Sequence, residues 1–336
     1  MTNILGIEIG GTKLQFGVGN GSSGELLVQE RYAVDRTQGA AGILKTIEQV
    51  APRLIAQHQV EKIGIGFGGP VHEGTVICSH QVSGWESFPL ASWCQEKFGC
   101  PAKVGNDCDV AALAEAIYGA ACGQEIVFYV TVGTGIGGGL VIGGKLHGQG
   151  RPAVAEIGHL RPVAPCAWHE GPWPTVESQA SGLGIVDTFM RFLRQADHPL
   201  TQSARRHAGS DRWQQDLERV EQRLAGWPDK SRAIVAQDIA QWAAQGNAVA
   251  QAALTHAIET LGWAIAQVIT LIAPNVVVVG GGVSLLGDEQ FFDPLRRAVL
   301  RYAFGPLKNS YQIVPAALGE WVVVVGAVAL AAQSSR

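Results

Sequence analysis

The chain has 336 residues, of which 47% are hydrophobic and 16% are charged. Disordered chains are rich in charge and poor in apolar side chains, so this composition excludes disorder and predicts a sizeable core, most simply in two domains. With a formal net charge of −4, nothing draws the chain as a whole to nucleic acid or to an anionic membrane. Its six cysteines contain no CxxC pair, so we expect reduced thiols in a cytoplasmic protein.

No targeting or membrane segment is evident in the sequence. The N-terminus lacks a basic region, and Glu8 together with several glycines interrupts its short apolar run. The most apolar stretch, 321–332, has 12 residues, whereas a helix that spans a bilayer needs about 20. We therefore expect a soluble protein without a membrane partner.

Hydrophobic periodicity predicts an alternation of strands and helices along the chain. The strands are expected, in order, at 3–9, 13–18, 25–34, 62–67, 102–105, on both sides of the glycine turn within 126–147, and at 276–279. The helices are expected at 40–58, 89–99, 109–120, at several places in 183–262, at 255–273 and at 326–333. This alternation predicts an α/β protein.

Glycine is the unusual residue, with 43 copies, roughly double the average usage of about 7%. Glycines gather where apolar runs end, in four strand-end turns: Gly10 and Gly11; Gly66, Gly68 and Gly69; the glycines of 133–139; and Gly280 to Gly282. A glycine turn after a strand lets the backbone approach a phosphate or a nucleotide closely. Any one cluster could equally be a tight turn, but four of them predict a phosphate or nucleotide site, to which we attribute most of the glycine excess.

Two common nucleotide loops do not fit. The run 133–138 formally matches GxGxxG, but the segment 140–144 that follows is β-like, whereas a dinucleotide fold requires a helix there. The stretch 139–145 nearly matches a Walker A loop, but Leu146 stands where Ser or Thr should bind Mg²⁺.

Two glycine-threonine hairpins, one near the start and one in mid-chain, suggest a triphosphate held between two domains. Here the chain resembles the ROK family of bacterial sugar kinases and sugar-responsive repressors. The matching segments occur in the family's order over nearly the whole chain: IGGTK at 9–13, GGPV at 68–71, ND at 106–107, GTGIGGG at 133–139, EIGH at 156–159, Glu177 with SG at 181–182, and GGGVS at 280–284.

The resemblance implies the actin-like ATPase (ribonuclease H-like) fold, an α/β fold of two domains with an interdomain active-site cleft. Residues 1–120 would form the N-terminal domain, with the phosphate hairpin and the sugar and base residues. Residues 121–317 would form the C-terminal domain, with a helical segment, the nucleotide hairpin and the adenosine site. Residues 318–336 would form a helix that packs back on the N-terminal domain. A homodimer is also implied.

The implied activity is that of an ATP-dependent, glucokinase-like sugar kinase that phosphorylates a hexose, at the 6-hydroxyl if the sugar resembles glucose. Asp107 is the expected general base, since transfer to a hydroxyl needs a carboxylate within reach of the attacking oxygen. By position alone, between a strand and a helix, Asp107 would equally suit a helix cap. Asp109 is expected to be an ordinary acid at a helix start.

The resemblance also assigns the binding residues. The sugar-binding set is Gly68, Gly69, Asn106, Asp107, Glu156, His159 and Glu177. The ATP-binding set is Gly10, Gly11, Thr12, Lys13, Gly133, Thr134, Gly135 and Gly137, with Gly280, Gly281 and Gly282 beside the nucleoside. Glu8 stands where the family usually has Asp, so a longer carboxylate would assist Mg²⁺ through water.

Zinc is not expected. Many family members carry a cysteine cluster that forms a structural zinc site with the EIGH-type histidine. This chain retains Cys166 and adds His169; with His159 they make three groups at irregular spacing, fewer than the four ligands of such a site.

Two other functions are compatible with the sequence. The lost cysteine cluster and the exchange at Glu8 suggest a catalytically silent sugar-binding protein. A repressor relative would carry a helix-turn-helix domain before the first hairpin, and the strand that begins near Ile4 leaves no room for one. The sequence leaves open which sugar is used and whether the donor is ATP or polyphosphate.

Overall fold

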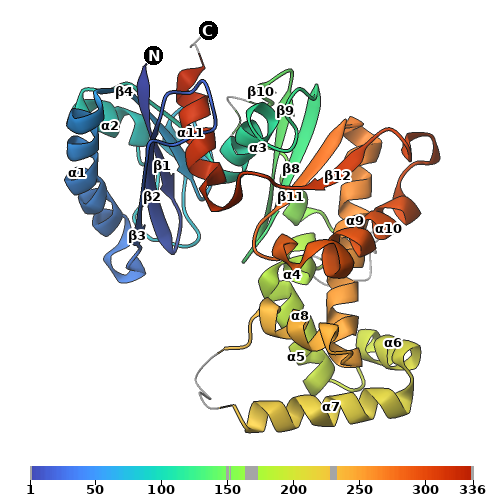
Figure 1. Cartoon of the computed structure of the whole chain (residues 1–336). Helices are drawn as coiled ribbons and strands as arrows, with labels where there is room; N and C mark the ends of the chain where they lie inside the picture. The colour runs from blue at the N-terminus through green and yellow to red at the C-terminus, as the bar shows by residue number, and fades with distance from the viewer. Residues whose placement is uncertain (1, 149–150, 152, 163–172, 228–232, 334–336) are drawn as a thin grey trace.

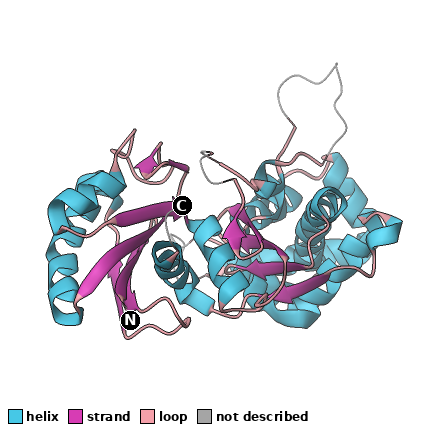
Figure 2. Cartoon of the chain, turned by 90° about the horizontal axis from the view of Figure 1, so that it is seen from above, coloured by secondary structure: helices cyan, strands magenta, loops and turns pink. Residues whose placement is uncertain are grey.

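The computed structural model describes residues 2–148, 151, 153–162, 173–227 and 233–333. These residues form two five-stranded mixed sheets. Helices cover the outer faces of the sheets and fill the space between them (Figures 1 and 2).

The first sheet has the strand order β3-β2-β1-β4-β7. Its strands are β1 (Asn3–Ile9), β2 (Lys13–Gly19), β3 (Val28–Ala33), β4 (Val60–Phe67) and β7 (Ala102–Asn106). The first three pair antiparallel, while β4 and β7 continue the sheet parallel to β1. The small hairpin β5 (Val71–His72) and β6 (Thr75–Val76) follows β4. Helices α1 (Gly39–His58) and α2 (Leu90–Phe98) lie on the outer side of this half (Figure 1).

The second sheet repeats this plan with the order β10-β9-β8-β11-β12. Its strands are β8 (Ile126–Val132), β9 (Ile136–Ile142), β10 (Lys145–Leu146), β11 (Val276–Gly280) and β12 (Gln312–Pro315). The connection from β3 to β4 is the single helix α1, but the corresponding connection from β10 to β11 is a helical subdomain. Its helices are α4 (Val176–Ala180), α5 (Gly182–Arg194), α6 (Pro199–Ala208), α7 (Ser210–Ala225), α8 (Ala236–Ala244) and α9 (Ala248–Ile272). Helix α10 (Asp293–Tyr302) lies between β11 and β12.

Helix α9 is the centre of the second half's core. Among the described residues, α9 is the one helix whose length and composition would allow it to cross a membrane. The sequence predicted a shorter helix here, from 255 to 273. However, 56% of its most apolar window is buried, and it packs against α4, α5, α8 and α10. A core helix has the same properties.

Helices α3 (Asp107–Ile117) and α11 (Val322–Ala332) form a layer between the two sheets (Figure 1). Helix α11 packs on β1 and β4, α3 packs on β8 and β9, and the two helices contact each other. Their backbones approach very closely. A Cβ atom on Gly64 would lie 1.8 Å from the carbonyl oxygen of Ala327, and one on Gly326 would lie 1.8 Å from that of Val110. Glycine is therefore required for this packing.

The glycine excess was thus misinterpreted in part. Gly66 lies inside β4, where an added Cβ would be 2.4 Å from a methyl carbon of Val323 in α11. Gly139 lies inside β9, where a Cβ would be 2.6 Å from the carbonyl oxygen of Cys108 in α3. These glycines serve helix-on-sheet packing and do not form a ligand turn.

Most predicted elements are confirmed in type, but several begin elsewhere. Helix α3 begins at Asp107, two residues early, because the side chain of Asn106 caps it. Helix α11 begins at Val322, four residues before the predicted start at 326. The four consecutive valines at its start have the sequence character of a strand, so periodicity did not indicate a helix there. Helix α9 begins at Ala248, behind the Asn247 cap, and not at 255.

The helix-on-sheet contact can be tested with Gly64→Ala. The added methyl group must push α11 away from β4, so we expect the free energy of unfolding to fall by about 3 kcal/mol. Gly305→Ala is the control, because no described atom lies within 4 Å of the Cβ position there. Thermal unfolding followed by circular dichroism measures both, and equal midpoints for Gly64→Ala and the wild type would contradict the packing argument.

Candidate active site

The first hairpin turn, between β1 and β2, presents the segment Gly10–Lys13. The N–H of Gly10 donates to the carbonyl oxygen of Lys13 at 3.0 Å, which closes the turn. Arg36 Nε donates to the carbonyl oxygen of Gly11 at 2.6 Å. A Cβ on Gly11 would collide with the side chain of Gln81, so that loop rests on the hairpin. Thr12 is exposed at the tip. No motif in the sequence indicated the contributions of Arg36 and Gln81.

Glu8 lies behind this turn and is only 6% exposed. Its Oε1 forms an ion pair with Lys13 Nζ at 3.1 Å, while its Oε2 is buried without a hydrogen-bond partner among the described residues. Burial raises the pKa of Glu8 to about 7; the charge of Lys13 lowers it, and the charges of Asp107 and Glu320 raise it further. The site therefore contains a buried carboxylate oxygen that can still accept a hydrogen bond.

Asp107 is the first residue of α3, and its neighbour Asn106 caps the helix. Asn106 Oδ1 accepts from the N–H groups of Cys108 and Asp109, and its Nδ2 donates to the carbonyl oxygen of Gly69 at 3.1 Å. Asp107 Oδ1 accepts from the N–H of Cys108 at 2.8 Å, while its Oδ2 lies 3.5 Å from the Cβ position of Gly68. Burial raises the pKa of Asp107 above its ordinary value. The cap is thus Asn106. The Asp107 carboxylate also forms a hydrogen bond with the Cys108 side chain, and its Oδ2 lies beside the Gly68 turn.

Asp109 belongs to the same electrostatic group, contrary to the expectation of an ordinary helix-start acid. Burial, Glu156 and Asp107 raise its pKa to about 7, and its Oδ1 is buried without a partner among the described residues. The side chain of Glu156 is exposed, but surrounding atoms displace enough water to raise its pKa; His159 lowers this pKa, while Asp107 and Glu177 raise it. The predicted carboxylates are therefore close enough to influence one another.

Glu177, in the first turn of α4, connects this group to the second hairpin. Its Oε2 accepts from the N–H of Ile136 at 2.8 Å and lies 2.4 Å from the Cβ position of Gly135. The N–H of Gly182 donates to the carbonyl oxygen of Gly133 at 2.7 Å. The helical subdomain thus holds both ends of this glycine turn.

A cavity of about 330 Å³ opens beside the second hairpin. Of the predicted residues, Gly133, Thr134 and Gly282 line it. Gly280 instead faces the hydroxyl group of Tyr129, and Gly281 adopts a left-handed φ of 88°. Most of the wall was not predicted: Leu183, Val186, Ile234, Val235, Ala236, Gln237, Val283 and Leu286. These residues are mainly apolar and, apart from Val283 in the GGGVS segment, belong to no motif.

A groove of about 720 Å³ reaches Asn106 and Asp109 from the open edge of β7. Lys103, His147 and Arg151 add positive or polar groups to its wall. Glu156, His159 and Glu177 do not line this groove.

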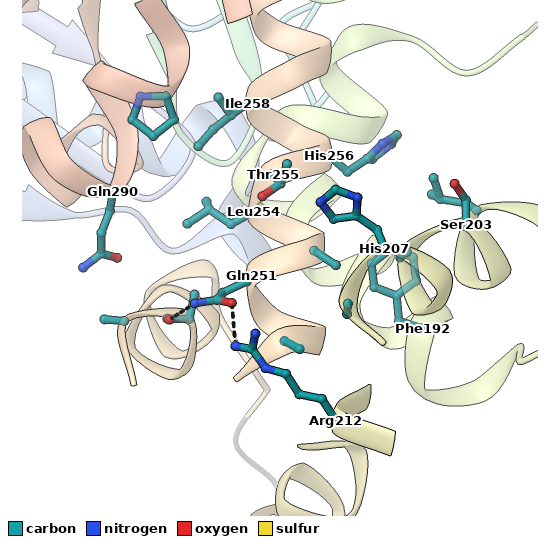
Figure 3. A pocket seen from close by; sticks show the side chains of 18 of the residues that line it. Phe192, Ser203, His207, Arg212, Gln251, Leu254, Thr255, His256, Ile258 and Gln290 are labelled. Carbon is teal, nitrogen blue, oxygen red and sulfur yellow. Dashed lines mark hydrogen bonds between the residues drawn. The ribbon is translucent and has the colours of Figure 1, made fainter. Parts of the chain in front are cut away.

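A third cavity, of about 810 Å³, lies among α5, α6, α8 and α9. Figure 3 shows His207, Arg212 and His256 around it, and Arg212 Nη2 donates a hydrogen bond to Gln251 Oε1 at 3.3 Å. None of the predicted site residues lines it.

The zinc question falls mostly outside the described residues, since Cys166 and His169 are not among them. His159 is described; it ends a short 3₁₀ turn and is exposed. Within the described part of the chain, no group of three or more His, Cys, Asp or Glu side chains is placed to hold a metal ion.

A family model described as the ROK family matches residues 4–334. The chain belongs to the ROK family. It is 30% identical to a glucokinase of Halalkalibacterium halodurans, over 96% of this chain and 92% of that protein. It is 24% identical to a xylose repressor of Caldicellulosiruptor bescii, over 98% of this chain and 77% of that longer protein.

The structure agrees with this membership. A ROK family glucokinase from Streptomyces griseus, solved in complex with glucose and AMPPNP, superposes with a TM-score of 0.76. It is 30% identical, and the match covers 99% of this chain and all of that one. The fold is therefore the actin-like ATPase fold of ROK sugar kinases, as the sequence predicted.

The buried Glu8 of this ROK protein predicts a pH-dependent stability. Because its pKa is raised from 4.5 to about 7, the folded state binds this proton more tightly than the unfolded chain does. That stabilisation is complete below pH 4.5 and is lost as the pH rises through 7. Relative to Glu8→Gln, the wild type should lose about 2 to 3 kcal/mol of unfolding free energy between pH 5 and 8.

Urea unfolding at several pH values measures this difference. The control is Glu25→Gln, at an exposed position, which should follow the wild type at every pH. A constant difference between the wild type and Glu8→Gln across this range would show that the carboxyl group does not titrate there.

Proposed function

We propose that the chain is an ATP-dependent sugar kinase that phosphorylates a hexose hydroxyl, with the 6-hydroxyl of glucose or a related hexose as the first candidate. The observation that carries this proposal is the placement of Asp107. Its Oδ1 is held by the N–H of Cys108, and its Oδ2 lies beside the Gly68 turn. Membership of the ROK family and similarity to glucokinases support the same activity.

Asp107 acts as the general base in this proposal. Its Oδ2 accepts the proton of the sugar hydroxyl while the hydroxyl oxygen bonds to the γ-phosphorus. The bond from the γ-phosphorus to the bridging oxygen breaks at the same time and releases ADP. Because burial raises the pKa of Asp107, its carboxylate is a stronger base than an exposed one. The nearby charge of Lys13 favours the ionised form that a base requires.

In this proposal ATP would lie between the two hairpins. The mainly apolar cavity beside Gly133, Thr134 and Gly282 suits a nucleoside, and the backbone N–H groups of both turns suit phosphate oxygens. Lys13 and Arg36 are both cations at the first turn, and Lys13 would exchange its contact with Glu8 for phosphate.

The residues also fit Mg²⁺, which neutralises phosphate charge when it is bound. Oε2 of Glu8, which has no hydrogen-bond partner among the described residues, is a buried acceptor suited to a metal-bound water molecule.

Asn106, Glu156, His159 and Glu177 are the proposed sugar ligands. A carboxylate can accept hydrogen bonds from two hydroxyl groups, so Glu156 and Glu177 would fix the orientation of the ring. For Glu177 this requires its contact with the N–H of Ile136 to be shared or exchanged when sugar binds.

Asp107→Asn tests the assigned base. The amide keeps an oxygen for the N–H of Cys108 but cannot accept the proton, so kcat should fall about 1,000-fold. The dissociation constant of the sugar, measured by calorimetry, should change little. Asp197→Asn, at an exposed position, is the matched control and should behave like the wild type. A kcat within a few-fold of wild type for Asp107→Asn would exclude this base.

Gly282→Leu tests the nucleotide cavity. Among the described atoms, only Gln237 Nε2, at 4.0 Å, approaches the Cβ position of Gly282, so the fold accommodates the side chain while the cavity loses volume. The KM for ATP should rise at least about 10-fold, and the KM for sugar should stay near its wild-type value. Gly305→Leu is the control off the site. An unchanged KM for ATP would place the nucleoside elsewhere.

A coupled assay of ADP release over a panel of hexoses and N-acetylhexosamines identifies the substrate, with polyphosphate tested as the alternative donor. Binding of a sugar without turnover on any donor would instead support a silent sugar-binding protein.

A further inference from the structure

The chain passes between the two sheets at two places. The first crossover, residues 118–125, leads from α3 to β8, and the second, residues 316–321, leads from β12 back to α11. Both lie at the end of α3 that is remote from Asp107. If one half rotates relative to the other, the backbone of these two segments must bend.

A single buried carboxylate connects both crossovers. Glu115, in the last part of α3, is 0% exposed. Its Oε1 accepts from the N–H groups of Ala317 and Leu318, both at 2.9 Å, in the second crossover. Its Oε2 accepts from the N–H of Ala120 at 2.8 Å, in the first crossover.

The surroundings of Glu115 are shaped to this contact. A Cβ on Gly119 would lie 2.1 Å from Oε2, so the first crossover can wrap around the carboxylate only because glycine stands there. No described Lys or Arg forms an ion pair with Glu115. A buried charge without a counter-ion needs hydrogen-bond donors on both oxygens, and the backbones of the two crossovers supply them.

Glu115 and Asp107 are on the same helix. Eight residues separate them, which corresponds to about 12 Å along α3. The intervening helix is rigidly seated, because Val110 is in contact with Gly326 of α11 and Cys108 is in contact with Gly139 of β9. A shift at the Glu115 end of α3 is therefore transmitted to Asp107.

We propose that Glu115 is a positioning residue whose carboxylate pins both interdomain crossovers to α3, so that the two halves close on their ligands about a fixed point while Asp107 stays in register with the second hairpin. The link to catalysis rests on the proposed kinase function, but the pinning of the crossovers does not. The pin is present in the open and the closed state, and residues on either side of it rotate.

Glu115→Gln is the informative variant. Its amide oxygen can serve one crossover, but its NH₂ group then faces an N–H donor of the other. We expect kcat to fall about 100-fold through imprecise alignment, while the KM values for sugar and ATP change less than about 3-fold. Small-angle X-ray scattering should show a smaller contraction than in the wild type on addition of glucose and AMPPNP.

Two further variants complete the test. Glu125→Gln, an exposed glutamate of the first crossover, is the matched control and should retain both kcat and contraction. Gly119→Ala displaces the Glu115 carboxylate without changing its charge, and should reproduce the kcat loss and the reduced contraction of Glu115→Gln.

The outcomes separate the two proposals. A wild-type protein that binds glucose and contracts without turning over any sugar would refute the kinase, and the contraction would still report on the pin. Wild-type kcat and contraction in either folded variant would overturn the role of Glu115. Loss of folding in both variants would also overturn it, since the carboxylate would then serve stability alone.

Discussion

The layer of α3 and α11 depends on backbone contacts that only glycine allows. Gly64 admits α11 to the first sheet, Gly139 admits α3 to the second, and Gly326 lets the two helices touch. Because these contacts join backbone to backbone, they leave little freedom for sliding. The groups at the start of α3 are therefore placed relative to the second sheet by packing, before any ligand arrives.

The same layer controls the charges of the site. Glu8 is buried at the end of β1, and Asp107 and Asp109 open the helix that lies between the sheets. Close packing removes water from all three carboxyl groups, and this desolvation is the largest cause of their raised pKa values. The packing that positions these three carboxyl groups therefore also raises their pKa values, which makes their carboxylates stronger bases than exposed ones.

Strand periodicity and glycine turns are local signals, and they predicted the α/β class and the hairpins; the resemblance to the ROK family implied the fold. The sequence could not separate a glycine that meets a ligand from one that meets a helix, and Gly66 was misread for that reason. It also missed the apolar wall at Ile234–Gln237, which only the tertiary fold brings to the second hairpin. Asp109 and Glu115 carry no motif, and their importance comes from burial and from partners distant in sequence.

The two halves share one strand order but differ in one connection, from β3 to β4 in the first half and from β10 to β11 in the second. In the first half this connection is α1; in the second it has grown into α4–α9, whose residues supply much of the wall beside Thr134. The enlargement stands outside both sheets. Mutations can therefore reshape this wall while the acids at the first sheet and the helix layer between the halves stay as they are.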